Sequence, residues 1–115
     1  NPSAGGALKS WLSEEPSPTV AICGMMANKD NGGFLSPLAS HVSYLFTVPI
    51  PGHDGCASAE DLAGHAREAG FENVTPCADL AEAYASSKEF VTAGRGRLLV
   101  CGSLYLAGEV LKTHR

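Results

Sequence analysis

The sequence lacks the features that mark membrane proteins and nucleic-acid-binding proteins. Glycine, proline or charged residues interrupt its apolar stretches before the roughly 18 residues that a membrane-spanning helix requires, and no basic segment leads into a short apolar one as in a secretory signal. The net charge is −4, which leaves no basic surface for a phosphate backbone or an anionic membrane. We therefore expect a soluble, cytoplasmic protein that binds neither nucleic acid nor membrane.

Paired cysteines are also missing. The cysteines lie far apart in the chain, with no CxxC spacing: Cys23, Cys56, Cys77 and Cys101. Such usage is typical of reduced cytosolic thiols. His53, Asp54 and Cys56 share one loop, but a structural zinc ion needs four ligands at paired spacings. The nearest other histidines, His41 and His65, lie on expected helices without a matching partner, so we predict no metal site.

The chain has no phosphate-binding loop of the GxxxxGK[ST] kind. The glycines of Gly94-Arg95-Gly96-Arg97 precede an apolar run, whereas a loop that cradles phosphates follows a strand and opens a helix. No nucleophile and base can be paired from local spacing. The chain alone therefore lacks both the usual groups for holding ATP and Mg²⁺ and a complete active site.

The 115 residues, 44% of them hydrophobic and 17% charged, suit one domain with one core. A chain of this length buries enough surface to fold without disulfides or metal. Its first residue is Asn rather than Met, and a helix-start pattern follows at once. We interpret residues 1–115 as a single domain and expect it to be a fragment of a larger protein.

Helical patterns and short apolar runs alternate along the chain. Asn1 can cap a helix that starts at Pro2 and places on one apolar face Ala4, Ala7, Leu8, Trp11 and Leu12. Further helices are expected over 33–42, from the Ser58 cap to Gly70, from Pro76 and from Leu104. Strands are expected over 19–26, 44–48, 71–75 and 98–101, the last being the clearest buried strand. This order predicts an α/β fold, a Rossmann-like three-layer αβα sandwich with about four mainly parallel strands.

Ligands of such sheets bind beyond the carboxyl ends of the strands, here near loops 1–2, 27–30, 49–57 and 102–104. Ser103 follows a strand and a glycine and stands in the first turn of an expected helix. Free N–H groups, the hydroxyl and the positive helix end can hold a carboxylate or phosphate there. The alternative is that Ser103 only caps the helix.

Lys29 lies in a second loop that follows a strand and precedes a helix, Ala27-Asn28-Lys29-Asp30. Its ammonium group can offer a cation to a phosphate or carboxylate at the same edge of the sheet. The alternative is a solvated lysine that pairs weakly with Asp30. Trp11, Met25 and Met26 fall on faces that we expect to be core.

Three segments together resemble the carboxy-terminal domain shared by the Mur ligases and the folylpolyglutamate synthase/dihydrofolate synthase enzymes. Asn1-Pro2 and the following helix are similar to the end of the family's DGAHNP segment. Residues 24–30 are similar to its G-M-x-x-D-K-D loop, and residues 101–105 to its C-G-S-L-Y turn. The resemblance spans nearly the whole chain. The serine turn favours the folate branch over the peptidoglycan branch.

In that family ATP phosphorylates a folate carboxylate, and the amine of glutamate then displaces phosphate to form an amide. The resemblance implies that an amino-terminal domain binds ATP and Mg²⁺, while this domain closes over the site and helps to bind glutamate. Ser103 and the backbone of Leu104 would then receive a glutamate carboxylate, and Lys29 would face an anion of glutamate or of the acyl phosphate. Asn1 and Asp30 would lie near the nucleotide. The implied partners are glutamate, a pteroate or folate substrate and the amino-terminal domain.

The chain departs from the family pattern in two places. The aspartate and histidine that precede Asn-Pro in the family are absent because the chain begins after them, and Asn28 replaces the first acid of the lysine loop. The loop 51–56 matches no family segment, so we assign it no function. We expect the isolated chain to be inactive. If the family's preceding strand is missing, an unpaired sheet edge favours self-association.

Two rival functions are weighed against this one. A Mur-type peptidoglycan ligase would catalyse the same class of reaction with another acceptor and amino acid. A non-catalytic α/β module, such as a receiver-like or nucleotide-sensing regulatory domain, would need clustered acids at strand ends and an aspartate ending a central strand. The sequence shows neither feature.

Overall fold

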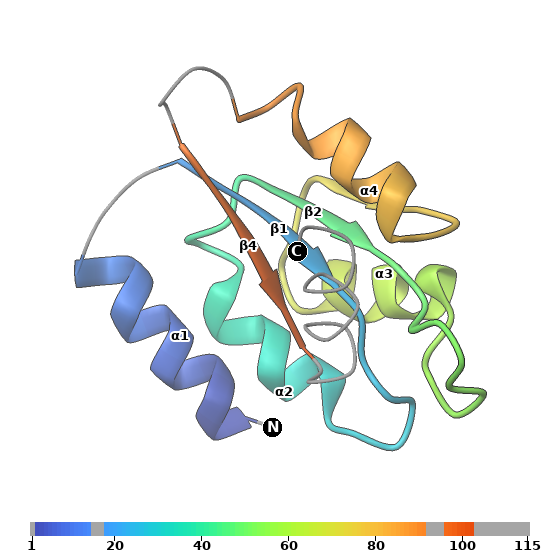
Figure 1. Cartoon of the computed structure of the whole chain (residues 1–115). Coiled ribbons are helices and arrows are strands. Elements are labelled where there is room, and N and C mark those ends of the chain that lie inside the picture. Colours follow the sequence, from blue (N-terminus) through green and yellow to red (C-terminus); the bar gives the residue numbers. More distant parts are fainter. Residues whose placement is uncertain (1, 15–17, 92–95, 103–115) are drawn as a thin grey trace.

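Parallel strands form the central sheet of the computed structural model, which describes residues 2–14, 18–91 and 96–102 (Figure 1). The strands are β1 (Thr19–Cys23), β2 (Tyr44–Thr47), β3 (Val74–Pro76) and β4 (Arg97–Cys101), and their order in the sheet is β3-β2-β1-β4. The helices are α1 (Pro2–Glu14), α2 (Asn31–Leu35), the 3₁₀ helix η1 (Ser36–Leu38), α3 (Ala59–Glu68) and α4 (Leu80–Ser87). The expected α/β fold with a parallel sheet is confirmed.

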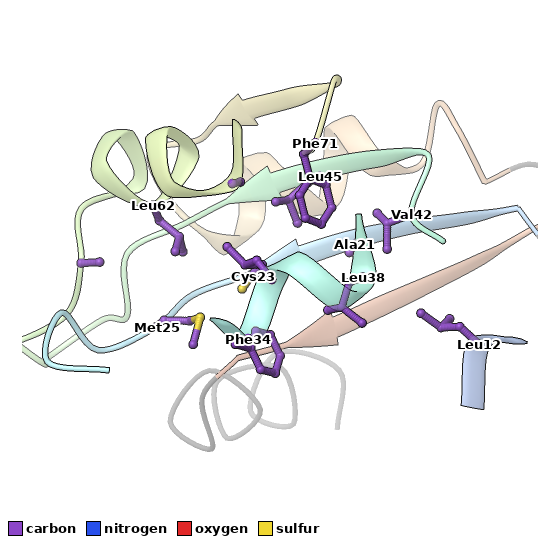
Figure 2. Packing of buried hydrophobic residues seen from close by; sticks show 13 residues of the cluster. Leu12, Ala21, Cys23, Met25, Phe34, Leu38, Val42, Leu45, Leu62 and Phe71 are labelled. Carbon is purple, nitrogen blue, oxygen red and sulfur yellow. The ribbon is translucent and has the colours of Figure 1, made fainter. Parts of the chain in front are cut away.

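Alternate side chains of the strands face two separate apolar layers. On one face, Ala21, Cys23 and Leu45 pack with residues of α1, α2, η1 and α3 (Figure 2). On the other face, Val20, Ile22 and Phe46 pack with Leu80 and Ala83 of α4. Every residue of β1 is buried, as expected for a central parallel strand. The three-layer arrangement is confirmed by these two clusters.

Proline and capping residues move two helices away from their predicted bounds. The helix expected over 33–42 starts earlier, at Asn31, because the Asp30 side chain caps it, and it gives way to η1, whose first turn contains Pro37. The helix expected from Pro76 begins at Leu80 behind the Asp79 cap, and Pro76 instead ends β3. None of the described helices is long and apolar enough to cross a membrane.

Trp11 and β4 are less buried than their sequence patterns predict. Trp11 is 45% exposed, so its expected place in the core is wrong. Its ring lies 4.7 Å from the Arg97 guanidinium, a cation–π contact between α1 and β4. All residues of β4 are half-buried, because this strand lies at the end of the sheet order and pairs with β1 alone among the described strands. β4 is therefore not the most buried strand; β1 is.

A close contact between α1 and α2 gives a test of this packing. A Cβ atom on Gly5 would collide with the backbone carbonyl of Phe34, whereas a Cβ on Gly6 would meet nothing within 4 Å. We expect Gly5→Ala to lower the free energy of unfolding by about 1–3 kcal/mol. Gly6→Ala should raise it by about 0.5–1 kcal/mol, because alanine is the better helix former. Urea unfolding of both variants measures the difference, and equal effects would contradict the packing of α1 on α2.

Candidate functional site

The candidate site lies where the chain order of the sheet reverses. β1, β2 and β3 follow one another in one direction, and β4 returns to the opposite side of β1. β1 and β4 run parallel (Figure 1), and their register sets Cys23 opposite Cys101. The loops that follow them therefore leave the sheet side by side, at the kind of position where open α/β sheets bind ligands.

The turn after β4 touches the turn after β1 directly. Gly24 donates a backbone hydrogen bond to the Cys101 carbonyl over 3.4 Å. Gly102 has a φ of 108°, and a Cβ there would collide with the Gly24 carbonyl oxygen and lie 2.9 Å from Cγ of Met25. Glycine is therefore needed at position 102 both for its backbone conformation and for this close approach.

The lysine turn begins two residues beyond this contact. The Lys29 N–H donates to the Met26 carbonyl over 3.4 Å, and the Asn31 N–H donates to the Lys29 carbonyl over 2.9 Å. The Asp30 carboxylate accepts a hydrogen bond from the Gly33 N–H at 2.9 Å and so caps α2. Lys29 is exposed, and no ion pair joins it to Asp30 within residues 18–91. The Asp30 carboxylate thus serves as the cap of α2, and an anion-binding role of Lys29 stays a prediction.

A third loop, residues 49–57 between β2 and α3, packs against the lysine turn. Met26 and Cys56 form an antiparallel bridge, flanked by hydrogen bonds from the Ala27 N–H to the Gly55 carbonyl (2.9 Å) and from the Ala57 N–H to the Met25 carbonyl (2.8 Å). The sequence predicts this loop at the binding edge of the sheet but indicates no role for residues 51–56. Its Pro-Gly and Asp-Gly dipeptides are a signal for tight turns, but pairing with a loop 30 residues away has no sequence signal.

Two buried thiols follow from the sheet, Cys23 at the end of β1 and Cys77 just after β3. Cys23 is fully buried, and a hydrogen bond with the Cys101 side chain, together with burial, raises its pKa well above the ordinary value. Burial, with the nearby charges of Glu82 and Asp79, raises the pKa of Cys77 to about 11. Both thiols are therefore protonated at neutral pH and are poor nucleophiles. They serve as small apolar side chains rather than as reactive groups.

The structure describes some of the residues named in the sequence analysis. Met25 is buried as expected, and Met26 is half-buried. Lys29 and Asp30 lie in the loop between β1 and α2, and the first residues of that loop contact the end of β4. Ser103, Leu104 and Asn1, as well as the helix expected from Leu104, lie outside the described residues. Within residues 2–14, 18–91 and 96–102, no three His, Cys, Asp or Glu side chains gather in a way that could hold a metal ion.

The fold of this chain matches that of solved folylpolyglutamate synthases. A Mycobacterium tuberculosis folylpolyglutamate synthase complexed with ADP matches with a TM-score of 0.89 at 24% identity, covering 100% of this chain and 28% of that one. E. coli FolC in complex with DHPP and ADP matches with a TM-score of 0.81 at 26% identity, over 98% and 26% of the two chains. A bifunctional folylpolyglutamate synthase/dihydrofolate synthase from Yersinia pestis, complexed with AMPPNP and a Mn ion, matches with a TM-score of 0.82 at 25% identity, over 98% and 26%.

The chain thus spans about a quarter of the length of these enzymes, 26–28%. No protein-family model matches it, and no curated protein sequence matches it. The resemblance to a folylpolyglutamate synthase domain, first suggested by three short segments, is confirmed by the structural match over nearly all of the chain.

The contact between the turns after β1 and β4 gives a second test. Gly52 (φ 75°) and Gly102 (φ 108°) both have positive φ, so alanine strains either position by about 1–3 kcal/mol. A Cβ on Gly52 meets nothing within 4 Å, whereas one on Gly102 collides with Gly24. We expect Gly102→Ala to destabilise the chain by at least about 1 kcal/mol more than Gly52→Ala. Chemical denaturation of the two variants measures this, and an equal loss would mean that the turns do not touch.

Proposed function

We propose that the chain is the glutamate-binding domain of an ATP-dependent ligase that adds glutamate to dihydropteroate or folates. Three findings support this. The structural neighbours are folylpolyglutamate synthases, one of them with Mn, AMPPNP and L-glutamate bound. The chain covers only about a quarter of their length, as a domain would. Above all, the ends of β1 and β4 meet, which brings the lysine turn and the start of the serine turn to one edge of the sheet.

Glutamate is a demanding ligand for this chain because both of its carboxylates are ionised at neutral pH. The chain has a net charge of −4, so its overall field does not attract such a ligand. Recognition must come from local cations and N–H donors. In the proposal, Lys29 supplies a cation to a carboxylate or to the acyl phosphate, and the Ser103 hydroxyl and the Leu104 N–H bind a carboxylate.

The proposed reaction has two steps. The γ-phosphoryl group of ATP passes to a carboxylate of the pteroate or folate substrate, giving an acyl phosphate and ADP. The glutamate amine then attacks the acyl carbon, the bond to phosphate breaks, and an amide and inorganic phosphate are formed. ATP and Mg²⁺ supply the phosphoryl group and are held mainly by the amino-terminal domain, with Asn1 and Asp30 placed near the nucleotide. This chain contributes position and charge to the second step.

The roles of Ser103 and Lys29 can be tested in the intact ligase that contains this chain. We expect Ser103→Ala and Lys29→Met each to raise the KM for glutamate about tenfold or more, because each removes a charge-assisted contact to the incoming amino acid. The KM for ATP should stay within about twofold. The measurement is steady-state phosphate release at varied glutamate and varied ATP.

Lys9→Met is the matched control, because Lys9 is an exposed lysine of α1 outside the site. Its kinetics should equal those of the wild type. An unchanged glutamate KM in both site variants would remove the proposed roles. Transfer of labelled glutamate to a nucleotide-linked peptide instead of to a folate would replace the proposal with a Mur-type ligase.

A further inference from the structure

We infer that residues 49–57, the loop between β2 and α3, are the positioning element of the lysine turn, and that their backbone contacts set how tightly the incoming amino acid is held. This inference rests on the proposed function and extends it to a loop that matches no segment of the family pattern. The support is a set of backbone contacts within loop 49–57 and between this loop and residues 25–27. None of these contacts involves Lys29 itself.

The base of the loop is fixed to the core. The Thr47 hydroxyl donates a buried hydrogen bond to the Ala59 carbonyl at 2.7 Å, which ties the end of β2 to the start of α3. Ile50 is 2% exposed, and its N–H donates to the Cys56 sulfur over 3.3 Å. Both ends of the loop therefore move with the sheet and with α3 rather than with solvent.

Two successive turns make the rest of the loop compact. The His53 N–H donates to the Ile50 carbonyl over 3.3 Å, with Pro51 and Gly52 in the central positions, and Gly52 has a φ of 75°. Proline followed by a glycine with positive φ is the signature of a type II turn. The Cys56 N–H then donates to the His53 carbonyl over 3.1 Å. These turns reverse the direction of the chain, and Cys56 then forms the bridge with Met26.

The bridge holds the last residues before the lysine turn from one side. Its two hydrogen bonds, from the Ala27 N–H and to the Met25 carbonyl, flank Met26 on the side of loop 49–57. The β4 end contacts the same segment at Gly24 and Met25. Residues 24–27 are therefore clamped between the end of β4 and loop 49–57. Lys29 lies two residues beyond the clamp and is exposed, so the clamp fixes the backbone from which its side chain extends.

This arrangement predicts a selective effect on the incoming amino acid. A ligand that binds to a pre-positioned lysine does not have to order the turn, so loosening the clamp weakens binding of that ligand alone. In the proposed function, ATP and folate bind mainly on the amino-terminal domain, and Asp30, which lies near the nucleotide in that proposal, is held separately as the cap of α2. Their binding should therefore change much less than that of glutamate. A loop that only stabilised the fold would instead lower all activities together with the melting temperature.

The test is to remove one hydrogen bond of the clamp without changing the fold of the turn. Ala27 is exposed and occupies the second position of the turn from Met26 to Lys29, where proline is well accommodated. Ala27→Pro removes the N–H that reaches the Gly55 carbonyl and puts the proline ring where that hydrogen lay, which separates loop 49–57 from the turn. Ala27→Ser is the conservative partner, because it keeps the N–H and adds only a small polar group.

In the intact ligase, we expect Ala27→Pro to raise the KM for glutamate roughly five- to tenfold, the usual effect of one lost hydrogen bond. The KM values for ATP and folate, and the melting temperature, should stay close to those of the wild type. Ala27→Ser should have the same glutamate KM as the wild type, because it keeps the hydrogen bond to Gly55. An unchanged glutamate KM in Ala27→Pro would overturn the inference, and so would an equal rise in all three KM values accompanied by a lower melting temperature.

A second readout does not depend on catalysis. Cys56 is half-buried inside the clamp, and its alkylation rate can be followed by peptide mass spectrometry, separately from the other cysteines. In ligand-free protein we expect Cys56 to react several times faster in Ala27→Pro than in Ala27→Ser. Equal rates would show that the clamp does not hold the turn. If the wild type released no phosphate in response to glutamate, the proposed function would fall, while the alkylation result would still decide whether the clamp exists.

Discussion

The parallel, in-register pairing of β1 with β4 is the contact on which the rest of the site depends. It places Cys23 beside Cys101, and a glycine follows each strand, so the two backbones touch where side chains would have held them apart. No binding group sits at this contact. Its consequence is geometric, because two loops that are separated by more than 70 residues in the chain leave the sheet from adjacent points. Chemistry that needs a cation from one loop and N–H donors from another can use this arrangement.

Much of the fold follows from local signals in the sequence. The buried run 19–23, the Ser58 cap and the positive-φ glycine after α3 each mark an element that the structure contains. The errors arise where two local signals compete. Pro76 can open a helix or end an edge strand. Because Asp79 caps the helix that begins at Leu80, Pro76 ends the strand instead. Trp11 follows the helical period of α1, but Arg97, 86 residues further along the chain, holds its ring at the surface.

The candidate site was predictable only as a list of loops. Strand order can be limited by general rules, but sequence periodicity does not reveal which loops touch. The residues 49–57 illustrate this, because their contacts with residues 25–27 are made by backbone atoms and leave no pattern of side-chain types. Lys29 was identifiable because its loop resembles a family segment, and the capping role of Asp30 was hidden because the same aspartate also looked like a partner for the lysine.

The contact between Trp11 and Arg97 has a practical consequence. The chain contains one tryptophan, and its half-exposed ring is stacked on a guanidinium that also donates hydrogen bonds to Thr19 and to the Leu12 carbonyl. α1, β1 and β4 therefore converge on a single fluorophore, and its emission reports whether the outer strand is seated on the sheet. The protein thus carries a built-in optical reporter for the strand that leads into the serine turn.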